Sequence, residues 1–131
     1  MIEGVGIDVV EIERMNRTIR EWGDIFLRKV FTDQEISYAT SKRTPVPHIA
    51  GRFAVKEAVA KAMKIGWSSG FRWKDVEVVN DPAGKPSVKL YGRAKERLKH
   101  SNIFVSISHS DSIVISIAII EKREKDVAFR E

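Results

Sequence analysis

The period of hydrophobic and polar positions changes along the first third of the chain, and the changes predict where the elements begin. Residues 2–10 alternate loosely between apolar and other side chains, which is typical of a strand. Residues 11–30 then favour a helix, because their apolar residues recur at helical spacing: Ile12, Met15, Ile19 and Trp22. Thr32 followed by Glu35 has the spacing of a capping box, so a short helix is expected to begin there.

The middle of the chain predicts one long amphipathic helix, from about residue 48 to residue 64. Pro45 and Pro47 mark the break before this helix, and Pro47 can occupy its first turn, where no N–H group is needed. Gly66 and Gly70 are expected to end it.

The second half of the chain predicts two strand pairs with a short basic helix between them: strands 75–79 and 87–92, helix 92–100, and strands 103–110 and 113–120. Residues 80–86 favour a tight turn in the first pair, and residues 110–112 a short turn in the second. We therefore expect a single α+β domain over residues 1–131, with a mainly antiparallel sheet and one long central helix. The charged tail, about residues 121–131, is expected to fray.

Composition narrows the setting and the partner. The sequence has no cysteine, which excludes a disulfide framework and a thiolate site and fits the reducing cytoplasm. No signal peptide is visible and no apolar run approaches the ~20 residues of a membrane span, so we expect a cytoplasmic protein without a membrane partner. The formal net charge of +5 predicts an acidic or phosphorylated partner, without choosing among them.

Asp8 is the first candidate for chemistry. On a strand it shares a face with Gly4, Gly6 and Val10, and an acid among such neighbours is costly unless it is paired or binds a metal. The two glycines would leave space beside it for a ligand. Alternatively, Asp8 caps the following helix or pairs with an arginine.

The long helix carries the second candidate group. Phe53, Glu57 and Lys61 follow one another at i, i+4 and i+8, so they share one helix face, and His48 and Arg52 form a neighbouring row. A carboxylate at Glu57 could bind a hard cation, and Lys61 could neutralise phosphate oxygens. The alternative is an ordinary Glu–Lys pair on a solvated face.

Together these acids fit a particular chemistry. Mg²⁺ in proteins is commonly held by one or two carboxylates plus substrate phosphates and waters, and Asp8 and Glu57 would supply the two. The combination with Lys61 suits transfer of a phosphoryl-linked group. His109 could reach a ligand from its strand end or bond to backbone, and Gly84 allows the 80–86 turn to approach a ligand or to be a plain hairpin turn.

Four segments occur in an order that is more specific than any one of them: residues 6–15 (GIDVVEIERM), 51–62 (GRFAVKEAVAKA), 80–86 (NDPAGKP) and 106–110 (SISHS). Over about residues 4–120 the chain thereby resembles the holo-acyl-carrier-protein synthases, the small trimeric type of the 4'-phosphopantetheinyl transferase superfamily. The resemblance implies a homotrimer with active sites at its interfaces. It also implies transfer of the 4'-phosphopantetheine arm of coenzyme A to a serine of apo-acyl carrier protein in fatty acid biosynthesis, releasing adenosine 3',5'-bisphosphate.

The resemblance also implies residue roles. Asp8 and Glu57 match the magnesium ligands and Lys61 the lysine near the pyrophosphate, which makes these three the catalytic candidates. The serine proton would pass to Glu57 or to a metal-bound water that Glu57 orients. The positions that match coenzyme A contacts are Arg52, Lys61, Gly84, Lys85, Pro86 and His109.

A basic surface for the acidic carrier protein is expected on the first helix. Arg14 matches a carrier-binding position, and Arg17 and Arg20 lie on the same helical stretch. Between residues 14 and 30 five basic residues face two acids, and five minus two leaves +3. Such a patch would steer an acidic helix and raise the association rate more than the final affinity.

Two departures from the family and two rival functions remain open. Lys64 stands where the family usually has glycine, and residues 67–69 (WSS) are an unusual run. A basic nucleic-acid-binding module without enzymatic activity is the main rival, resting on the charge and on helix 92–100. The basic residues lack interleaved aromatics and no nucleic-acid motif is visible, so nucleic acid is not the expected partner. The other rival is the same transfer onto a peptidyl carrier protein.

Overall fold

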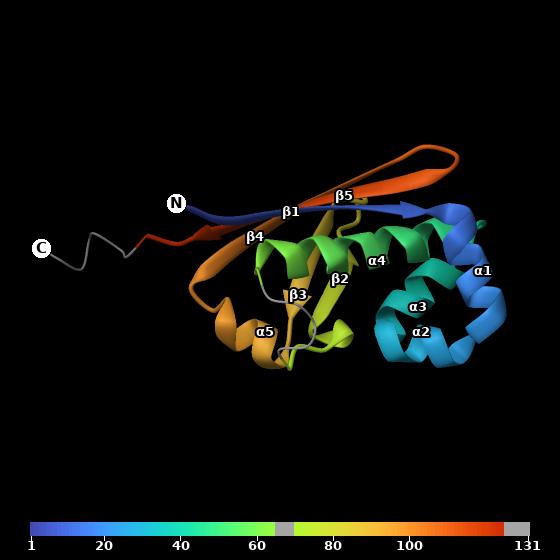
Figure 1. Cartoon of the computed structure of the whole chain (residues 1–131), viewed down its shortest axis with the longest axis horizontal. Helices are drawn as coiled ribbons and strands as arrows, with labels where there is room; N and C mark the ends of the chain where they lie inside the picture. The colour runs from blue at the N-terminus through green and yellow to red at the C-terminus, as the bar shows by residue number, and fades with distance from the viewer. Residues whose placement is uncertain (65–69, 125–131) are drawn as a thin grey trace, which may run out of the picture.

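The computed structural model describes residues 1–64 and 70–124, and in it one long helix lies along a three-stranded antiparallel sheet (Figure 1). The sheet has the order β1 (Ile2–Glu11), β5 (Ile113–Lys122) and β4 (Ser101–His109). The helix is α4 (Pro45–Ala62). The predicted α+β fold with a mainly antiparallel sheet and a long central helix is confirmed.

The other elements gather around α4. Three short helices, α1 (Ile12–Trp22), α2 (Asp24–Val30) and α3 (Asp33–Thr40), cluster at one end of the molecule. The hairpin of β2 (Val76–Asn80) and β3 (Pro86–Leu90) and the helix α5 (Gly92–Arg97) complete the fold. A 3₁₀ turn at Trp73–Asp75 leads into β2.

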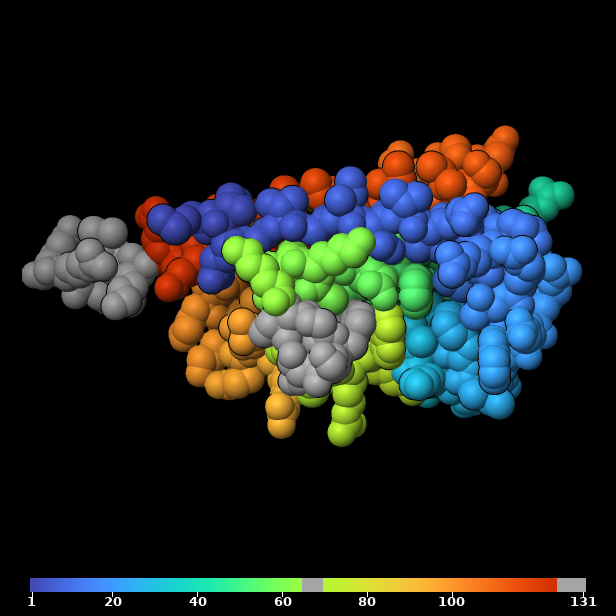
Figure 2. Space-filling model, viewed as in Figure 1, coloured from blue at the N-terminus to red at the C-terminus, as the bar shows by residue number. Residues whose placement is uncertain are grey.

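The central strand β5 is apolar on both faces, and the faces have different surroundings. Val114, Ser116, Ala118 and Ile120 are buried on the face toward α4, whereas the isoleucines between them are only half-buried. On the same outer face the neighbouring strands expose Val5, Ile7, Val9 and Phe104, each more than half exposed. Strand β1 lies at the surface along the molecule (Figure 2). One face of the sheet is therefore an uncovered apolar surface.

Strand β1 packs directly on the backbone of α4. A Cβ atom at Gly4 would lie 1.9 Å from the carbonyl oxygen of Ala62, and one at Gly6 would lie 1.9 Å from that of Ala58. The expectation that these glycines leave room for a ligand is therefore wrong. Their missing side chains let a strand and a helix touch, and this contact brings the end of β1 toward the middle of α4.

The long helix begins earlier and ends earlier than predicted. It starts at Pro45, because both prolines fit its first turn, and its last residue is Ala62, before either predicted glycine. Lys64 follows with a φ of 61°, the left-handed conformation that usually belongs to glycine just after a helix. Gly66 and residues 67–69 lie outside the described residues.

Lys64→Gly is expected to raise the free energy of unfolding by about 0.5–1 kcal/mol, because a residue with a Cβ atom is strained in the left-handed conformation. Chemical denaturation measures the change. Lys64→Ala, which removes the same charge but keeps the Cβ atom, is the control and should show no gain. Equal stabilities of the two variants would mean that backbone strain is not the cause.

Other boundaries also differ from the sequence prediction. The helical stretch 11–30 is split at Gly23, whose φ of 53° ends α1, and Trp22 is 56% exposed rather than on the core face. The basic helix is shorter, with six residues. Glu121 and Lys122, predicted to begin the frayed tail, are paired in β5 because they extend its ladder with β1 and β4.

None of the helices in the described part of the chain has the length and apolar character needed to cross a membrane.

Candidate active site

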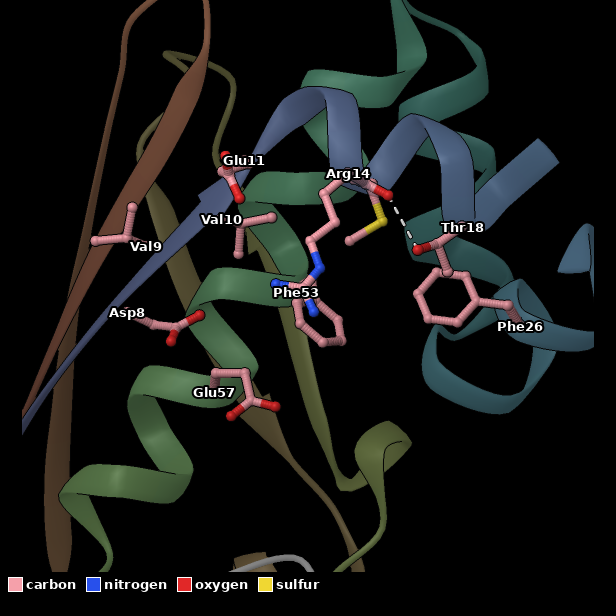
Figure 3. A pocket seen from close by; sticks show the side chains of 10 residues that line it. Asp8, Val9, Val10, Glu11, Arg14, Thr18, Phe26, Phe53 and Glu57 are labelled. Carbon is pink, nitrogen blue, oxygen red and sulfur yellow. Dashed lines mark hydrogen bonds between the residues drawn. The ribbon is translucent and has the colours of Figure 1, made fainter. Parts of the chain in front are cut away.

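A cavity of about 340 Å³ opens where the end of β1 meets α1, α2 and α4 (Figure 3). Asp8 reaches it from β1 and Glu57 from α4, so the two acids that lie 49 positions apart in the sequence line one cavity. The remaining lining residues are Val9, Val10, Glu11, Arg14, Met15, Thr18, Phe26 and Phe53. The predicted pairing of the two carboxylates in one place is what the fold produces.

Asp8 has a defined partner. Lys61 Nζ lies 2.9 Å from Asp8 Oδ1 and also donates to the carbonyl oxygen of Ile7 at 3.0 Å. The helix that follows β1 is capped at Glu11 without a side-chain hydrogen bond, so Asp8 is not its cap. Phe53, Glu57 and Lys61 share one face of α4 as predicted, and this face lies toward Asp8 near the end of β1.

The donor set of this cavity fits a hard divalent cation. Of the three carboxylates that line it, those of Asp8 and Glu57 are the predicted pair of oxygen ligands. Mg²⁺ takes its other ligands from water and substrate phosphates rather than from a complete protein cage. Among the described residues there is no group of three or more His, Cys, Asp or Glu side chains that could hold a metal alone.

One wall of the cavity is aromatic. The Phe53 ring stacks on Trp73 with centroids 5.2 Å apart, and Phe26 lies 6.2 Å from Phe53 on the other side. Trp73 precedes β2 and gave no signal in the sequence, because its partner is 20 residues away on another element. The stack fixes the wall next to Glu57.

The residues that match coenzyme A contacts line a second cavity, of about 460 Å³. Arg52, Gly84, Pro86 and His109 all border it, while Lys85 lies on the exposed turn between two of them. Among the described residues the two cavities share no lining residue. Of the predicted coenzyme A contacts, Lys61 lines neither cavity but pairs with Asp8, which lines the first.

Arg52 is buried and held by two residues that the sequence did not single out. Its guanidinium lies over the Tyr38 ring, 4.0 Å from the centroid, and donates to Asn80 Oδ1. Asn80 Nδ2 donates in turn to the carbonyl oxygen of Gly84 at 2.9 Å. Gly84 has a φ of 91°, as its predicted turn requires. The arginine thus orients the turn that borders its own cavity.

Positive charge accumulates in this second cavity. Burial, followed by the charges of Arg52, Lys42 and His109, lowers the pKa of His48 below its ordinary value of 6.5. Burial also lowers the pKa of Arg52, against the opposing effect of Glu35. A histidine whose pKa is lowered by neighbouring basic groups stands in a cavity suited to receive an anion.

The folded protein is expected to lose stability as the pH falls through about 6.5, because His48 binds fewer protons folded than unfolded. With more protons bound by the unfolded state, the free energy of unfolding decreases toward low pH. The Tm between pH 7.5 and 5.5 measures this, and His48→Gln should reduce the slope. An identical slope in the variant would assign the pH dependence to other groups.

The predicted carrier surface divides into two parts. All three arginines are exposed on α1, but Arg14 also lines the first cavity and points toward Phe53 in Figure 3. Arg20 is 3.4 Å from Glu13, so part of its charge is compensated. Trp22 and Ile25 expose apolar surface on the same stretch.

Comparison with known proteins agrees with this architecture. Residues 4–118 match the family model of the 4'-phosphopantetheinyl transferase superfamily. The chain is 50% identical to a holo-[acyl-carrier-protein] synthase of Caldicellulosiruptor saccharolyticus, over 95% of this chain and 100% of that protein. It is 46% identical to one of Thermodesulfovibrio yellowstonii, over 92% and 99%.

Solved structures give the same result. The holo-(acyl-carrier-protein) synthase of Bacillus anthracis in complex with CoA (3',5'-ADP) has a TM-score of 0.79 at 30% identity and covers 93% of this chain and 98% of its own. The synthase of Neisseria meningitidis has a TM-score of 0.83 at 31% identity, with coverages of 93% and 100%.

With this fold, two carboxylates in one cavity and a match over most of its length, the chain belongs to the 4'-phosphopantetheinyl transferase superfamily. Within that superfamily its relatives are holo-[acyl-carrier-protein] synthases, so the resemblance found from the four sequence segments is confirmed. The comparisons give no support to a nucleic-acid-binding module.

Proposed function

We propose that this protein transfers the 4'-phosphopantetheine arm of coenzyme A to a serine of apo-acyl carrier protein, leaving adenosine 3',5'-bisphosphate. The observation that carries the proposal is the meeting of Asp8 and Glu57 at one cavity, with Lys61 paired to Asp8. The relatives named holo-[acyl-carrier-protein] synthase, one of them solved with CoA, supply the substrate class. The partners proposed are therefore coenzyme A and the carrier protein.

In the proposed reaction the serine oxygen forms a bond to the β-phosphorus of coenzyme A while the bond from that phosphorus to the bridging pyrophosphate oxygen breaks. Asp8 and Glu57 would hold Mg²⁺, which when bound supplies positive charge to the pyrophosphate oxygens. Lys61 Nζ adds a fixed positive charge beside Asp8. Glu57, directly or through a water that it orients, accepts the serine proton.

The second cavity is proposed to bind the phosphates of the nucleotide end. Arg52 carries a positive charge there, and His48 and His109 offer ring nitrogens that can donate to phosphate oxygens. In the described part of the chain none of these three side chains forms an ion pair with a carboxylate. Gly84 and Pro86 also line this cavity. An anion in this cavity would raise the pKa of His48 again, so His48 should take up protons when coenzyme A binds.

A homotrimer is proposed because one substrate has to reach both cavities. The exposed apolar face of the sheet offers the surface for association. Association through a ring of copies would place the first cavity of one chain against the second cavity of its neighbour. Each active site would then take Asp8 and Glu57 from one chain and His109 from the next.

Mixing two inactive variants should restore activity if sites are shared. Asp8→Ala and His109→Ala are each expected to be nearly inactive. In randomly mixed trimers a site is intact when one chain keeps Asp8 and its neighbour keeps His109, one half times one half, or about one quarter of sites. Co-refolded mixtures are assayed against the separate variants. No recovery in a mixture that is trimeric would place each site within one chain.

The transfer itself is tested by mass spectrometry. The protein is mixed with coenzyme A, Mg²⁺ and apo-acyl carrier protein, and the carrier is expected to gain one phosphopantetheine arm. EDTA and Asp8→Ala should each abolish the gain. An apo-peptidyl carrier protein in parallel distinguishes the carrier class, and Arg17→Glu with Arg20→Glu should slow association with an acidic carrier. No gain with any competent carrier would reject the proposed function.

A further inference from the structure

A buried row of charged side chains runs along α4 beside the row that carries Glu57. Lys56 directly precedes Glu57 and is completely buried, one helical turn after Arg52. Glu35 of α3 and Glu77 of β2 are also buried, and Glu35 is only 1% exposed. The capping box that begins α3 is present as predicted, but it does not explain why the Glu35 carboxylate is directed into the protein.

Every donor of Lys56 has an acceptor. Its Nζ lies 2.8 Å from Glu35 Oε1 and 3.0 Å from the carbonyl oxygen of Trp73, and it also donates to the carbonyl oxygen of Val76. An ammonium group has three N–H donors, so the geometry of Lys56 is completely specified. The side chain therefore ties α4 to α3 and to the segment that leads into β2.

The carboxylates of Glu35 and Glu77 also have defined hydrogen-bond donors. Glu35 accepts from the backbone N–H of Thr32 and, through Oε2, from that of Val78, each at 2.9 Å. Glu77 accepts from the Thr32 hydroxyl and from the Tyr91 hydroxyl. Helices α3 and α4, strand β2 and the residue between β3 and α5 thus meet in one hydrogen-bonded group. It is defined here as the Lys56 network: Thr32, Glu35, Lys56, Glu77 and Tyr91.

Stability alone does not account for the Lys56 network. Burying an ion pair costs desolvation, and apolar residues of similar volume often serve a fold as well or better. Burial indeed lowers the pKa of Lys56, against the opposing charge of Glu35. A buried ion pair differs from an apolar contact because its hydrogen bonds are directional. Each of them restricts the rotation of the helix about its axis.

Rotation of α4 matters for the first cavity. A helix with its side chains is ~10–12 Å across, so a rotation of about 20° would move the Glu57 carboxylate by about 2 Å. Mg²⁺ accepts ligands only near 2.0–2.1 Å, so a displacement of about 2 Å would take the carboxylate out of coordination distance. Since Lys56 and Glu57 are adjacent on α4, whatever fixes Lys56 fixes the angle at which Glu57 leaves the helix.

We propose that the Lys56 network sets the rotation of α4 and thereby positions Glu57 opposite Asp8, with Lys56 and Glu35 as positioning residues rather than catalytic ones. The proposal rests on the proposed function for its consequence in catalysis. Its structural content, the placement of a cation-binding carboxylate, can be measured separately.

The test replaces the ion pair by a neutral one, Lys56→Met with Glu35→Gln, because removing one partner would leave a buried charge unpaired. The matched control is Lys99→Met with Glu96→Gln, which removes an exposed Lys–Glu pair with the same 2.8 Å separation. For each protein we would measure Mn²⁺ binding in the presence of coenzyme A by electron paramagnetic resonance, kcat, the KM for the carrier and the Tm. All assays are run well below the Tm of the variant concerned.

The buried double variant is expected to bind Mn²⁺ about 10-fold more weakly and to lose about 10- to 100-fold in kcat. The KM for the carrier should be unchanged, because the basic surface of α1 is untouched. The control should match the wild type throughout. A lower Tm with wild-type Mn²⁺ affinity and kcat would overturn the proposal, since that is the result of a purely structural role.

The positioning role can still be tested if the double variant does not fold or if the wild type is inactive. If the double variant does not fold, Tyr91→Phe removes only the hydroxyl that donates to Glu77, and Mn²⁺ affinity should still fall a few-fold; no change would overturn the proposal. If the wild type transfers no phosphopantetheine, the proposed function fails, but the Mn²⁺ titrations still decide the positioning role. A wild type that binds no Mn²⁺ would reject that role as well.

Discussion

Glu57→Gln is expected to lower kcat/KM for the transfer by about 10³-fold while the protein remains folded. Gln has the shape of Glu but neither its charge nor its basicity, so it removes one anionic ligand for a cation and the group that accepts the serine proton. General base catalysis alone contributes 10²–10⁴-fold in typical enzymes. Glu57 is half-buried at the edge of the first cavity, and the substitution changes no packing volume.

The assay for this prediction is a single-turnover measurement with saturating coenzyme A and Mg²⁺. Glu96→Gln is the matched control, because it makes the same substitution at an exposed position of α5 that lines neither cavity. It should transfer at the wild-type rate, and both variants should share the wild-type Tm within experimental error. Turnover by Glu57→Gln within a few-fold of the wild type would remove Glu57 from both roles.

Local sequence signals predicted most elements of the fold because those signals act over short distances. The strand-sized apolar run of residues 113–120 predicted β5, and the spacing of Thr32 and Glu35 predicted the capping box of α3. The helix periodicity that placed Phe53, Glu57 and Lys61 on one face was likewise correct. Ends were less predictable: Pro45 was read as a break, although a proline at the start of a helix costs no hydrogen bond.

Relations between distant segments could not be predicted in this way. Nothing near Glu35 in the sequence indicates that it pairs with Lys56, and nothing near Arg52 indicates that Tyr38 lies under its guanidinium. The separation of the predicted residues into two cavities is also a property of the fold. Which cavity a residue of α4 lines depends on the side of the helix from which its side chain projects. The first cavity is bordered by β1 and the second by β2.

Gly6 is the position where the close contact between β1 and α4 has its largest expected effect on stability. Gly6→Ala would place a Cβ atom 1.9 Å from the carbonyl oxygen of Ala58 and 2.8 Å from the amide nitrogen of Ala62. Both are backbone atoms of α4, so no side chain can move aside. Non-bonded heavy atoms prefer separations of about 3.5 Å, which requires the strand and the helix to part by roughly 1.5 Å. We expect a loss of about 3 kcal/mol or more in the free energy of unfolding.

The loss should extend to activity in whatever fraction of Gly6→Ala remains folded. Asp8 is two residues further along β1, so a strand that moves away from α4 carries Asp8 away from Glu57. A displacement of about 1 Å in a reacting group can cost about 10²-fold in rate. Chemical denaturation and the transfer assay on the folded fraction measure the two effects separately.

Gly51→Ala is the stability control, because the same substitution in the middle of α4 has the opposite expectation. A Cβ atom there would have no contact closer than 3.7 Å, to a methyl group of Ile107. Ala is favoured over Gly inside a helix by about 0.8–1 kcal/mol, so this variant should be more stable than the wild type. Opposite signs for the two Gly→Ala substitutions would establish that β1 and α4 meet backbone to backbone at Gly6. If Gly6→Ala kept wild-type stability, that contact could not be what holds Asp8 beside Glu57.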